Sequence, residues 1–185
     1  MNTYQPHNAP PPSPQTLMTD PNIKVIHPGG VADTSPPLYS LSVSNDSKPN
    51  VVVYRGPHSP SNIIGTAVFH SLSGKIDLVF HGQPMTIKPS GMTVAYHFEF
   101  PPVGKLKWQP NQTTGMGLEL RDASGMKVVK LKSTGFGSGE RVFEMMVPCD
   151  PRFVDLVVLS GWAVRANMDK DNSAVAEILG AVLGG

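Results

Sequence analysis

The sequence contains a single cysteine, has no clear export signal and has no long apolar run. Cys149 alone excludes an intramolecular disulfide framework and a zinc centre built from several cysteines. No stretch reaches the roughly 18 apolar residues that a membrane-spanning helix needs. The first residues show neither the basic nor the apolar segment of a secretory signal. We therefore predict an intracellular, cytoplasmic protein, with a membrane-peripheral or nuclear location as alternatives.

Charge is also scarce, and it is balanced. Fifteen Lys and Arg against 14 Asp and Glu give a formal net charge of +1, and charged residues make up 16% of the chain. An average soluble protein has about 25%. A chain-wide basic field is thereby excluded, so we expect no nucleic-acid partner, whereas local basic patches stay open.

Motifs for catalysis and metal binding are missing. The six histidines do not occur at metal-ligand spacing, either with one another or with Cys149. The segment Gly135-Phe136-Gly137-Ser138-Gly139 has no lysine to complete a phosphate loop and no serine at the centre of a nucleophile elbow. We interpret it as a hairpin loop. The sequence thus predicts a non-enzymatic protein without a cofactor, and an unrecognised enzyme is the third option behind two binding functions considered below.

Proline and glycine are abundant, with 19 and 18 residues among 185. Nine of the prolines lie in residues 1–37, where the run Pro10-Pro11-Pro12-Ser13-Pro14 occurs. A segment of this composition buries too little apolar surface to offset its ordering entropy. We predict a disordered tail with polyproline II character over residues 1–37. Within it, Ile23-Lys24-Val25-Ile26 is a short apolar patch and a candidate for docking onto the domain.

From Leu38 onward, apolar and polar residues alternate in short segments separated by turn residues. This pattern is typical of antiparallel strands in a meander, sandwich or barrel. The segment Asp122-Ala123-Ser124-Gly125 predicts a hairpin turn. We count about ten strands, which fall at 39–43, 51–54, 63–70, 75–80, 85–88, 93–100, 105–109, 118–121, 126–132 and 141–147.

The period changes after Asp150. Asp150 and Pro151 are typical of the N-cap and the first position of a helix, which we predict over residues 151–166. Apolar residues cover nearly its whole circumference, so it should be buried on all sides. The predicted fold is mainly β: a closed antiparallel barrel over residues 38–168, wrapped around this helix. We predict that residues 169–185 form a separate short segment, for which a helix is one option, with a small amphipathic stretch at 174–183.

The order of about ten strands followed by one buried helix resembles the tubby C-terminal-like superfamily, which includes LURP-one-related proteins and phospholipid scramblases. Within that superfamily, the chain resembles in particular the fungal domains of unknown function. The resemblance spans roughly residues 38–168 and implies a closed barrel of about twelve strands. The residues that carry it are Tyr39, Leu41, Val53-Tyr54-Arg55, Ile64-Gly65, Lys105-Leu106-Lys107-Trp108, Leu118-Glu119-Leu120-Arg121-Asp122, Gly125, Val128-Val129 and the segment 153–161.

The resemblance implies little about function, because the superfamily is defined by its fold. Its tubby members bind phosphoinositide headgroups through a basic cluster, and its scramblases carry cysteine-rich and calcium-binding segments. This chain has one cysteine, no acidic calcium loop and no basic cluster that aligns with the tubby site. No site residue is therefore carried over, and lipid scrambling is not expected.

A local basic surface is the first functional candidate. Between Lys105 and Arg141 there are seven basic residues and three acidic ones. On neighbouring strands they would form a positive patch that attracts an anionic phospholipid headgroup, with an ordinary charged exterior as the alternative. The candidate ligand-binding residues are Lys105, Lys107, Arg121, Lys127, Lys130 and Lys132.

A protein partner is the second candidate. Pro36-Pro37-Leu38-Tyr39 fits the Pro-Pro-x-Tyr ligand of WW domains, so Pro36, Pro37 and Tyr39 are the candidate partner-binding residues. The chain would then be an adaptor that acts through its Pro-rich tail. The alternative is that Tyr39 points inward from the first strand and cannot dock elsewhere.

Overall fold

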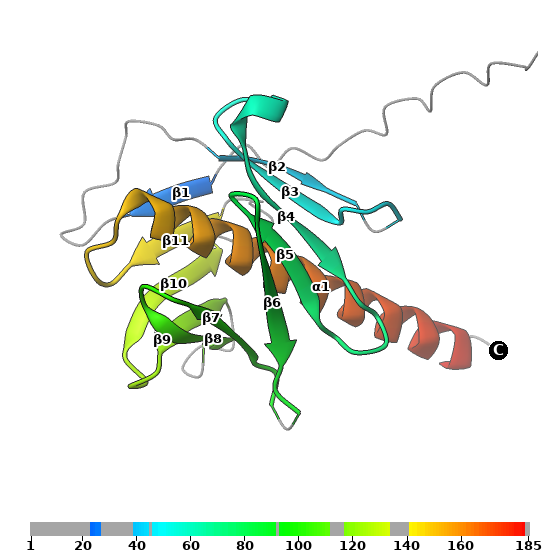
Figure 1. The fold of residues 1–185 in the computed structure, drawn as a ribbon. Coiled ribbons are helices and arrows are strands. Elements are labelled where there is room, and N and C mark those ends of the chain that lie inside the picture. Colours follow the sequence, from blue (N-terminus) through cyan, green and yellow to red (C-terminus); the bar gives the residue numbers. More distant parts are fainter. Residues whose placement is uncertain are drawn as a thin grey trace, which may run out of the picture.

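The computed structural model of the chain describes residues 23–26, 39–44, 46–91, 93–111, 117–133 and 141–183. The predicted tail therefore falls outside the described residues except for 23–26, and so does the glycine-rich segment 135–139. One curved sheet packs around one long helix (Figure 1). The strands are β1 (Ile23–Ile26), β2 (Tyr39–Val43), β3 (Val51–Arg55), β4 (Ile63–Phe69), β5 (Ile76–Phe80), β6 (Gln83–Pro89), β7 (Tyr96–Phe100), β8 (Gly104–Pro110), β9 (Leu118–Asp122), β10 (Lys127–Ser133) and β11 (Arg141–Met145), and a short 3₁₀ helix (Pro60–Asn62) precedes β4.

The sheet is an antiparallel meander with one added strand. Strands β2 to β11 each pair with the next along the chain, and β1 lies parallel to β11. The ten meandering strands and the hairpin turn at Asp122–Gly125 confirm the mainly β prediction, and Gly125 N–H donates to the Asp122 carbonyl at 3.0 Å. The apolar patch Ile23–Ile26 forms β1, so this part of the predicted tail belongs to the sheet.

The sheet does not close through hydrogen bonds. Its strand order begins at β1 and ends at β2, and within the described part of the chain no pairing joins these two strands. The predicted closed barrel is therefore not confirmed. The short β1 runs parallel to β11, an arrangement that the alternation of apolar residues in the meander did not predict.

The helix α1 (Pro151–Leu183) begins where the sequence predicts. Asp150 Oδ1 accepts a hydrogen bond from the Phe153 N–H at 2.9 Å, as an N-cap does. The helix continues past residue 166 to Leu183, so the predicted separate segment after 168 is part of the same helix. The pair Arg165 and Asp169, four residues apart and 3.0 Å between charged atoms, bridges the predicted end.

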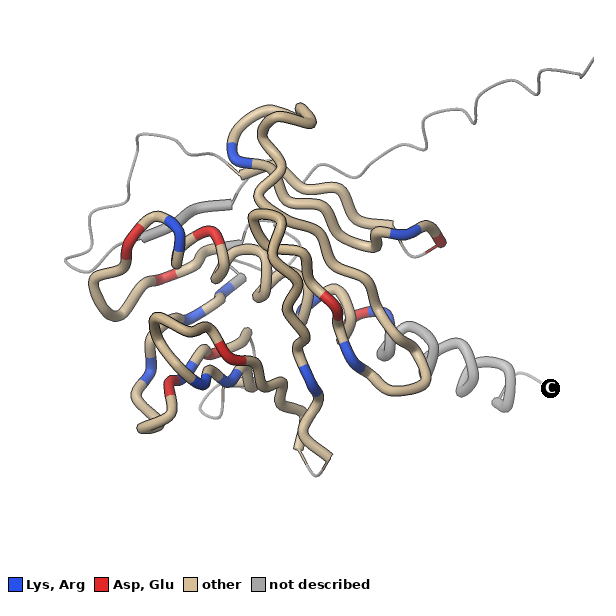
Figure 2. The backbone as a smooth tube through the Cα atoms, in the orientation of Figure 1, with Lys and Arg blue, Asp and Glu red and all other residues tan. Residues whose placement is uncertain are grey.

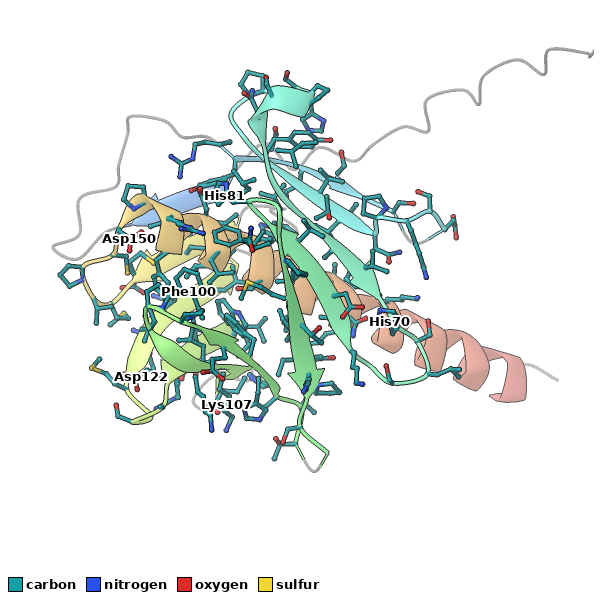
Figure 3. All side chains as sticks on the ribbon, viewed as in Figure 1. His70, His81, Phe100, Lys107, Asp122 and Asp150 are labelled. Atoms are coloured by element: carbon teal, nitrogen blue, oxygen red, sulfur yellow. The ribbon has the colours of Figure 1, made fainter. Side chains whose placement is uncertain are left out.

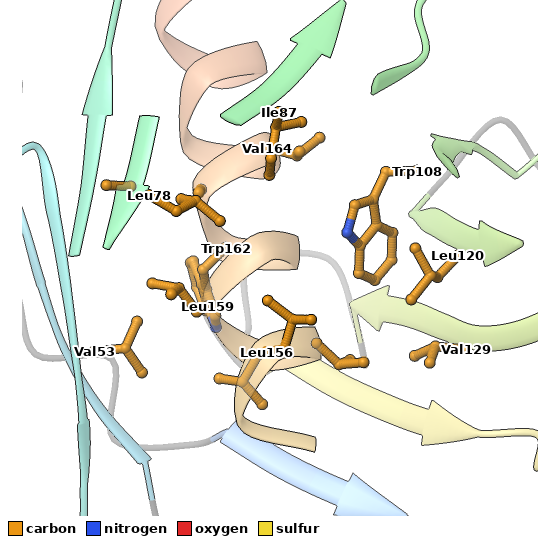
Figure 4. Close-up of a cluster of buried hydrophobic side chains, with 14 of the residues drawn as sticks. Val53, Leu78, Ile87, Trp108, Leu120, Val129, Leu156, Leu159, Trp162 and Val164 are labelled. Atoms are coloured by element: carbon orange, nitrogen blue, oxygen red, sulfur yellow. The ribbon is translucent and has the colours of Figure 1, made fainter. Parts of the chain in front are cut away.

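The core lies between the helix and both halves of the sheet (Figure 4). The apolar side chains of α1 between Phe153 and Ala163 are each at most 9% exposed. This part of the helix is therefore buried on all sides, as predicted. Polar contacts also join the helix to the sheet; in one of them the Trp108 Nε1–H donates to Ser160 Oγ at 3.0 Å. On β7 the inward residues are Tyr96, Phe98 and Phe100. Val94, which lies in the predicted strand 93–100, precedes β7 and is 62% exposed.

Candidate functional site

Five basic side chains lie opposite one another on five successive strands. The register pairs Lys88 of β6 with His97, His97 with Lys107, Lys107 with Arg121, and Arg121 with Lys127 of β10. Directly opposite residues of an antiparallel sheet share a face. The alternating neighbours Ile87, Phe98 and Leu106 are buried in the core, so this row faces outward. We call these five residues the cationic row.

A buried carboxylate holds one end of the cationic row. The side chain of Glu119 is 2% exposed, and its oxygens lie 2.9 Å from Arg121 Nη2 and 2.6 Å from Lys127 Nζ. Burial raises the pKa of Glu119, but the hydrogen bonds from Lys127 and Arg121 outweigh it and hold the pKa below its usual range. Within the described part of the chain, Lys88, His97 and Lys107 have no such side-chain partner.

The predicted basic residues thus divide into two groups. Lys107, Arg121 and Lys127 join the cationic row, to which sequence reasoning did not assign Lys88 and His97. Lys130 and Lys132 instead flank Glu144 of β11, with nitrogen to oxygen distances of 3.9 and 2.5 Å. Lys105 is exposed and lies opposite Glu99 in the register. Figure 2 shows Lys and Arg positions gathered on these strands with acidic positions among them.

Two exposed apolar residues stand at hairpin tips near the cationic row. Val103, in the β7–β8 turn, is 41% exposed, and Met126, in the β9–β10 turn, is 53% exposed. The two tips are neighbours because β8 pairs with β9. Apolar side chains beside cations suit a surface that meets headgroups and the acyl boundary together.

Tyr39 of the predicted WW ligand is buried. It is 2% exposed, and its hydroxyl donates a hydrogen bond to Asp155 Oδ1 at 2.8 Å. A side chain in this position cannot fill a groove on another protein while β2 stays paired. The partner-binding role predicted for Tyr39 therefore conflicts with the fold, and Pro36 and Pro37 lie outside the described residues.

Asp155 is the centre of a cluster that sequence reasoning missed. Its side chain is 3% exposed, inside the apolar part of α1. Besides Tyr39, Arg55 Nε donates to Oδ1 at 3.1 Å, and His81 Nε2 lies 3.1 Å from Oδ2. The available signal was a lone carboxylate in an apolar run, because a buried charge requires partners.

His81 reaches Asp155 from an unusual backbone position. It forms the two-residue β5–β6 turn with Gly82, and its φ is 45°. Such turns favour Asn, Asp or Gly, because other residues are strained at positive φ. A histidine there places an imidazole beside the start of α1 (Figure 3).

An open hollow of about 580 Å³ lies above this cluster. It is formed where four segments meet: the end of β3, the 3₁₀ helix with the start of β4, the β5–β6 turn and the start of α1. We call it the Arg55–Arg152 hollow, and its lining residues are Arg55, Ser61, Asn62, Ile63, Ile64, His81, Pro151, Arg152 and Asp155.

Cys149 precedes the helix and is half-buried. Burial is the main cause that raises the pKa of its thiol to about 11, and the charge of Asp150 adds to it. The thiol is therefore protonated at neutral pH and a weak nucleophile. Among the described residues, no three His, Cys, Asp or Glu side chains lie close enough to hold a metal ion.

The described helices include none with the length and hydropathy needed to cross a membrane. Comparison of the chain with protein-family models, curated proteins and solved structures finds no match. The resemblance to the tubby C-terminal-like superfamily therefore stays a prediction.

Proposed function

We propose that this chain is a non-catalytic binding module that recognises anionic phospholipid headgroups at a membrane surface. The observation that carries the proposal is the cationic row, which aligns five basic side chains across five strands. Strands are spaced about 4.8 Å apart, so the row extends over about 19 Å. That length suits an extended anionic surface better than one small ligand.

The cationic row keeps a net positive charge after its pairing with Glu119 is counted. Its four Lys and Arg residues against the single Glu119 carboxylate leave three positive charges, not counting His97. A cation near an anionic membrane contributes about 1 kcal/mol. Val103 and Met126 at the neighbouring hairpin tips add apolar contact with the bilayer interface.

The test is sedimentation of the full chain with vesicles. The vesicles contain phosphatidylcholine alone, or mixed with phosphatidylserine or a phosphoinositide, at about 50 and about 200 mM salt. We expect binding only to the anionic vesicles, and weaker binding at the higher salt. Lys88→Glu combined with Lys107→Glu should abolish it, because two cations of the row become anions. Neither lysine has an ion-pair partner among the described residues, so the change leaves none of these unpaired.

The matched control reverses two lysines elsewhere. Lys48 and Lys75 are exposed, in the β2–β3 and β4–β5 connections, and changing both to Glu alters the net charge equally. Binding should decline only modestly in this control. Absence of binding by the unchanged chain at low salt, or equal loss in both double variants, would overturn the proposal. A phosphoinositide requirement would separate specific recognition from general attraction to anionic lipid.

A further inference from the structure

The Arg55–Arg152 hollow exposes two arginine side chains, whereas the carboxylate in its lining, that of Asp155, is buried beneath its hydrogen-bond partners. Both oxygens of Asp155 are occupied, Oδ1 by Tyr39 and Arg55 and Oδ2 by His81. The side chain is only 3% exposed, so a ligand in the hollow meets the donors and not the acid.

Arg55 has N–H donors that its contacts with Asp155 and Pro151 do not use. A guanidinium has five N–H groups. Nε and Nη2 of Arg55 bind Asp155 and the Pro151 carbonyl, the latter at 3.2 Å. The two N–H groups of Nη1 have no partner within the described part of the chain, and the side chain is 38% exposed.

Arg152 is the second cation of the hollow. Its guanidinium carbon lies 5.9 Å from the centre of the Phe80 ring, which is buried and therefore fixed. This contact positions the guanidinium without neutralising it. Among the described residues, no carboxylate pairs with Arg152.

The other residues that line the hollow determine which organic group could accompany an anionic group in a ligand. Ile63, Ile64 and Pro151 form an apolar wall, and Ser61 and Asn62 add polar groups at the rim. The volume of about 580 Å³ lies within the usual range for small-molecule sites. Paired guanidinium groups favour phosphate, because their planar forks bind its oxygens in pairs.

We propose that the Arg55–Arg152 hollow binds a small organic phosphate monoester, with Arg55 and Arg152 on the phosphate and the isoleucine wall against the organic part. The site is separate from the cationic row and does not depend on the proposed membrane function. The same chemistry occurs in soluble esters and in the headgroup of phosphatidic acid.

The experiment is calorimetric titration of the full chain with glycerol 3-phosphate and with inorganic phosphate, at constant ionic strength and with glycerol as the neutral control. We expect saturable binding of glycerol 3-phosphate, weaker binding of inorganic phosphate and none of glycerol. Arg152→Ala should weaken it about tenfold, the effect of losing one charge-assisted hydrogen bond. Arg152 is exposed, so this variant should fold normally, as its unfolding transition would verify.

Two further variants make the result specific. Arg165→Ala removes an arginine from the same helix that pairs with Asp169 away from the hollow, and it should bind like the unchanged chain. His81→Asn keeps a residue that tolerates positive φ and removes the imidazole, and it should weaken binding. No saturable binding of either phosphate, or equal loss in Arg152→Ala and Arg165→Ala, would overturn the proposal.

Vesicles distinguish the two sources of the phosphate. If the hollow binds a lipid headgroup, the Arg152→Ala variant should lose the preference for vesicles with phosphatidic acid over vesicles with phosphatidylserine. If the hollow binds a soluble ester, the variant should bind vesicles like the unchanged chain but bind glycerol 3-phosphate more weakly. Either result supports the site. The Lys88→Glu and Lys107→Glu double variant should retain glycerol 3-phosphate binding, so failure of the membrane function is told apart from failure of this site.

Discussion

Asp155 carries a negative charge inside the apolar part of α1, and its three partners make that position tolerable. Tyr39, Arg55 and His81 come from β2, β3 and the β5–β6 turn, so one carboxylate ties the helix to three separate parts of the sheet. Removing one partner of a buried charge lowers stability by more than the ion pair contributes to it, because the remaining charge stays buried without a partner. The cluster therefore fixes the start of the helix against this half of the sheet.

Tyr39→Phe tests the cluster without changing its shape. Losing a hydrogen bond to a charged acceptor should lower the free energy of unfolding by about 1.5–3 kcal/mol at neutral pH. Burial, and then the charge of Asp155, raise the pKa of Tyr39 above its ordinary value. The folded chain thus keeps a proton that the unfolded chain releases above about pH 10, so stability falls as the pH rises through that value.

Urea unfolding between neutral pH and pH 11 measures both effects. The unchanged chain should lose stability above about pH 10, and Tyr39→Phe should lose less over the same interval. Tyr54→Phe is the matched control, because Tyr54 stacks on His58 and has no contact with Asp155. Identical alkaline slopes in the unchanged chain and in Tyr39→Phe would contradict the assignment.

At the scale of elements, two glycines stand where the helix and the sheet pack too closely for a Cβ. A Cβ placed on Gly161 of α1 would lie 2.7 Å from Phe143 Cε1 and 3.1 Å from Trp108 Cζ2. A Cβ on Gly65 of β4 would lie 2.5 Å from a methyl carbon of Leu159. Glycine therefore lets α1 approach the strands on both of its sides.

Gly161→Ala sets helix propensity against packing. Alanine favours a helix interior over glycine by about 1 kcal/mol. The Phe143 ring is 0% exposed and cannot move aside, so we expect overpacking to win and unfolding free energy to fall by about 1–3 kcal/mol. Thermal unfolding measures the change, and Gly91→Ala, with nothing within 4 Å, is the control. A more stable Gly161→Ala chain would refute the close approach.

The elements themselves were largely predictable, because their local patterns are strong. Alternation located β2 to β11, and the Asp150-Pro151 pair located the helix start. The end of the helix was not predictable from apolar pattern alone, since the pattern reports burial rather than helicity. After residue 166 the helix continues through a polar stretch, residues 169–173, and then the amphipathic stretch 174–183, without a proline, past the ends of the strands (Figure 1).

The candidate sites were less predictable, because they depend on register. The alternation showed that Lys107 and Arg121 face outward, but only the pairing of strands aligns them with Lys88 and His97. The pairing of β10 with β11 places Glu144 opposite Lys130 and within ion-pair distance of Lys132, which removes these lysines from the expected patch. The Arg55–Arg152 hollow combines residues from four segments that are distant in the sequence, so no spacing of residues along the chain predicts it.

At the scale of the whole molecule, the open sheet leaves β11 dependent on β1. A strand at the edge of a sheet exposes unpaired backbone groups that promote association with other chains. β1 covers β11 over four residue pairs, from Ile23 with Arg141 to Ile26 with Glu144. This short strand therefore protects an edge that the meander alone would leave open.

Two truncations test this role of β1. Removing residues 1–22 should leave the unfolding transition unchanged, because this truncation keeps β1 and its pairing with β11. Removing residues 1–26 should lower the free energy of unfolding by about 2 kcal/mol, from a few backbone hydrogen bonds worth about 0.5–1.5 kcal/mol each. It should also increase self-association through the exposed edge of β11. Urea unfolding and analytical ultracentrifugation measure the two effects. If both truncated chains matched the full chain in stability and mass, β1 would have no role in holding the sheet together.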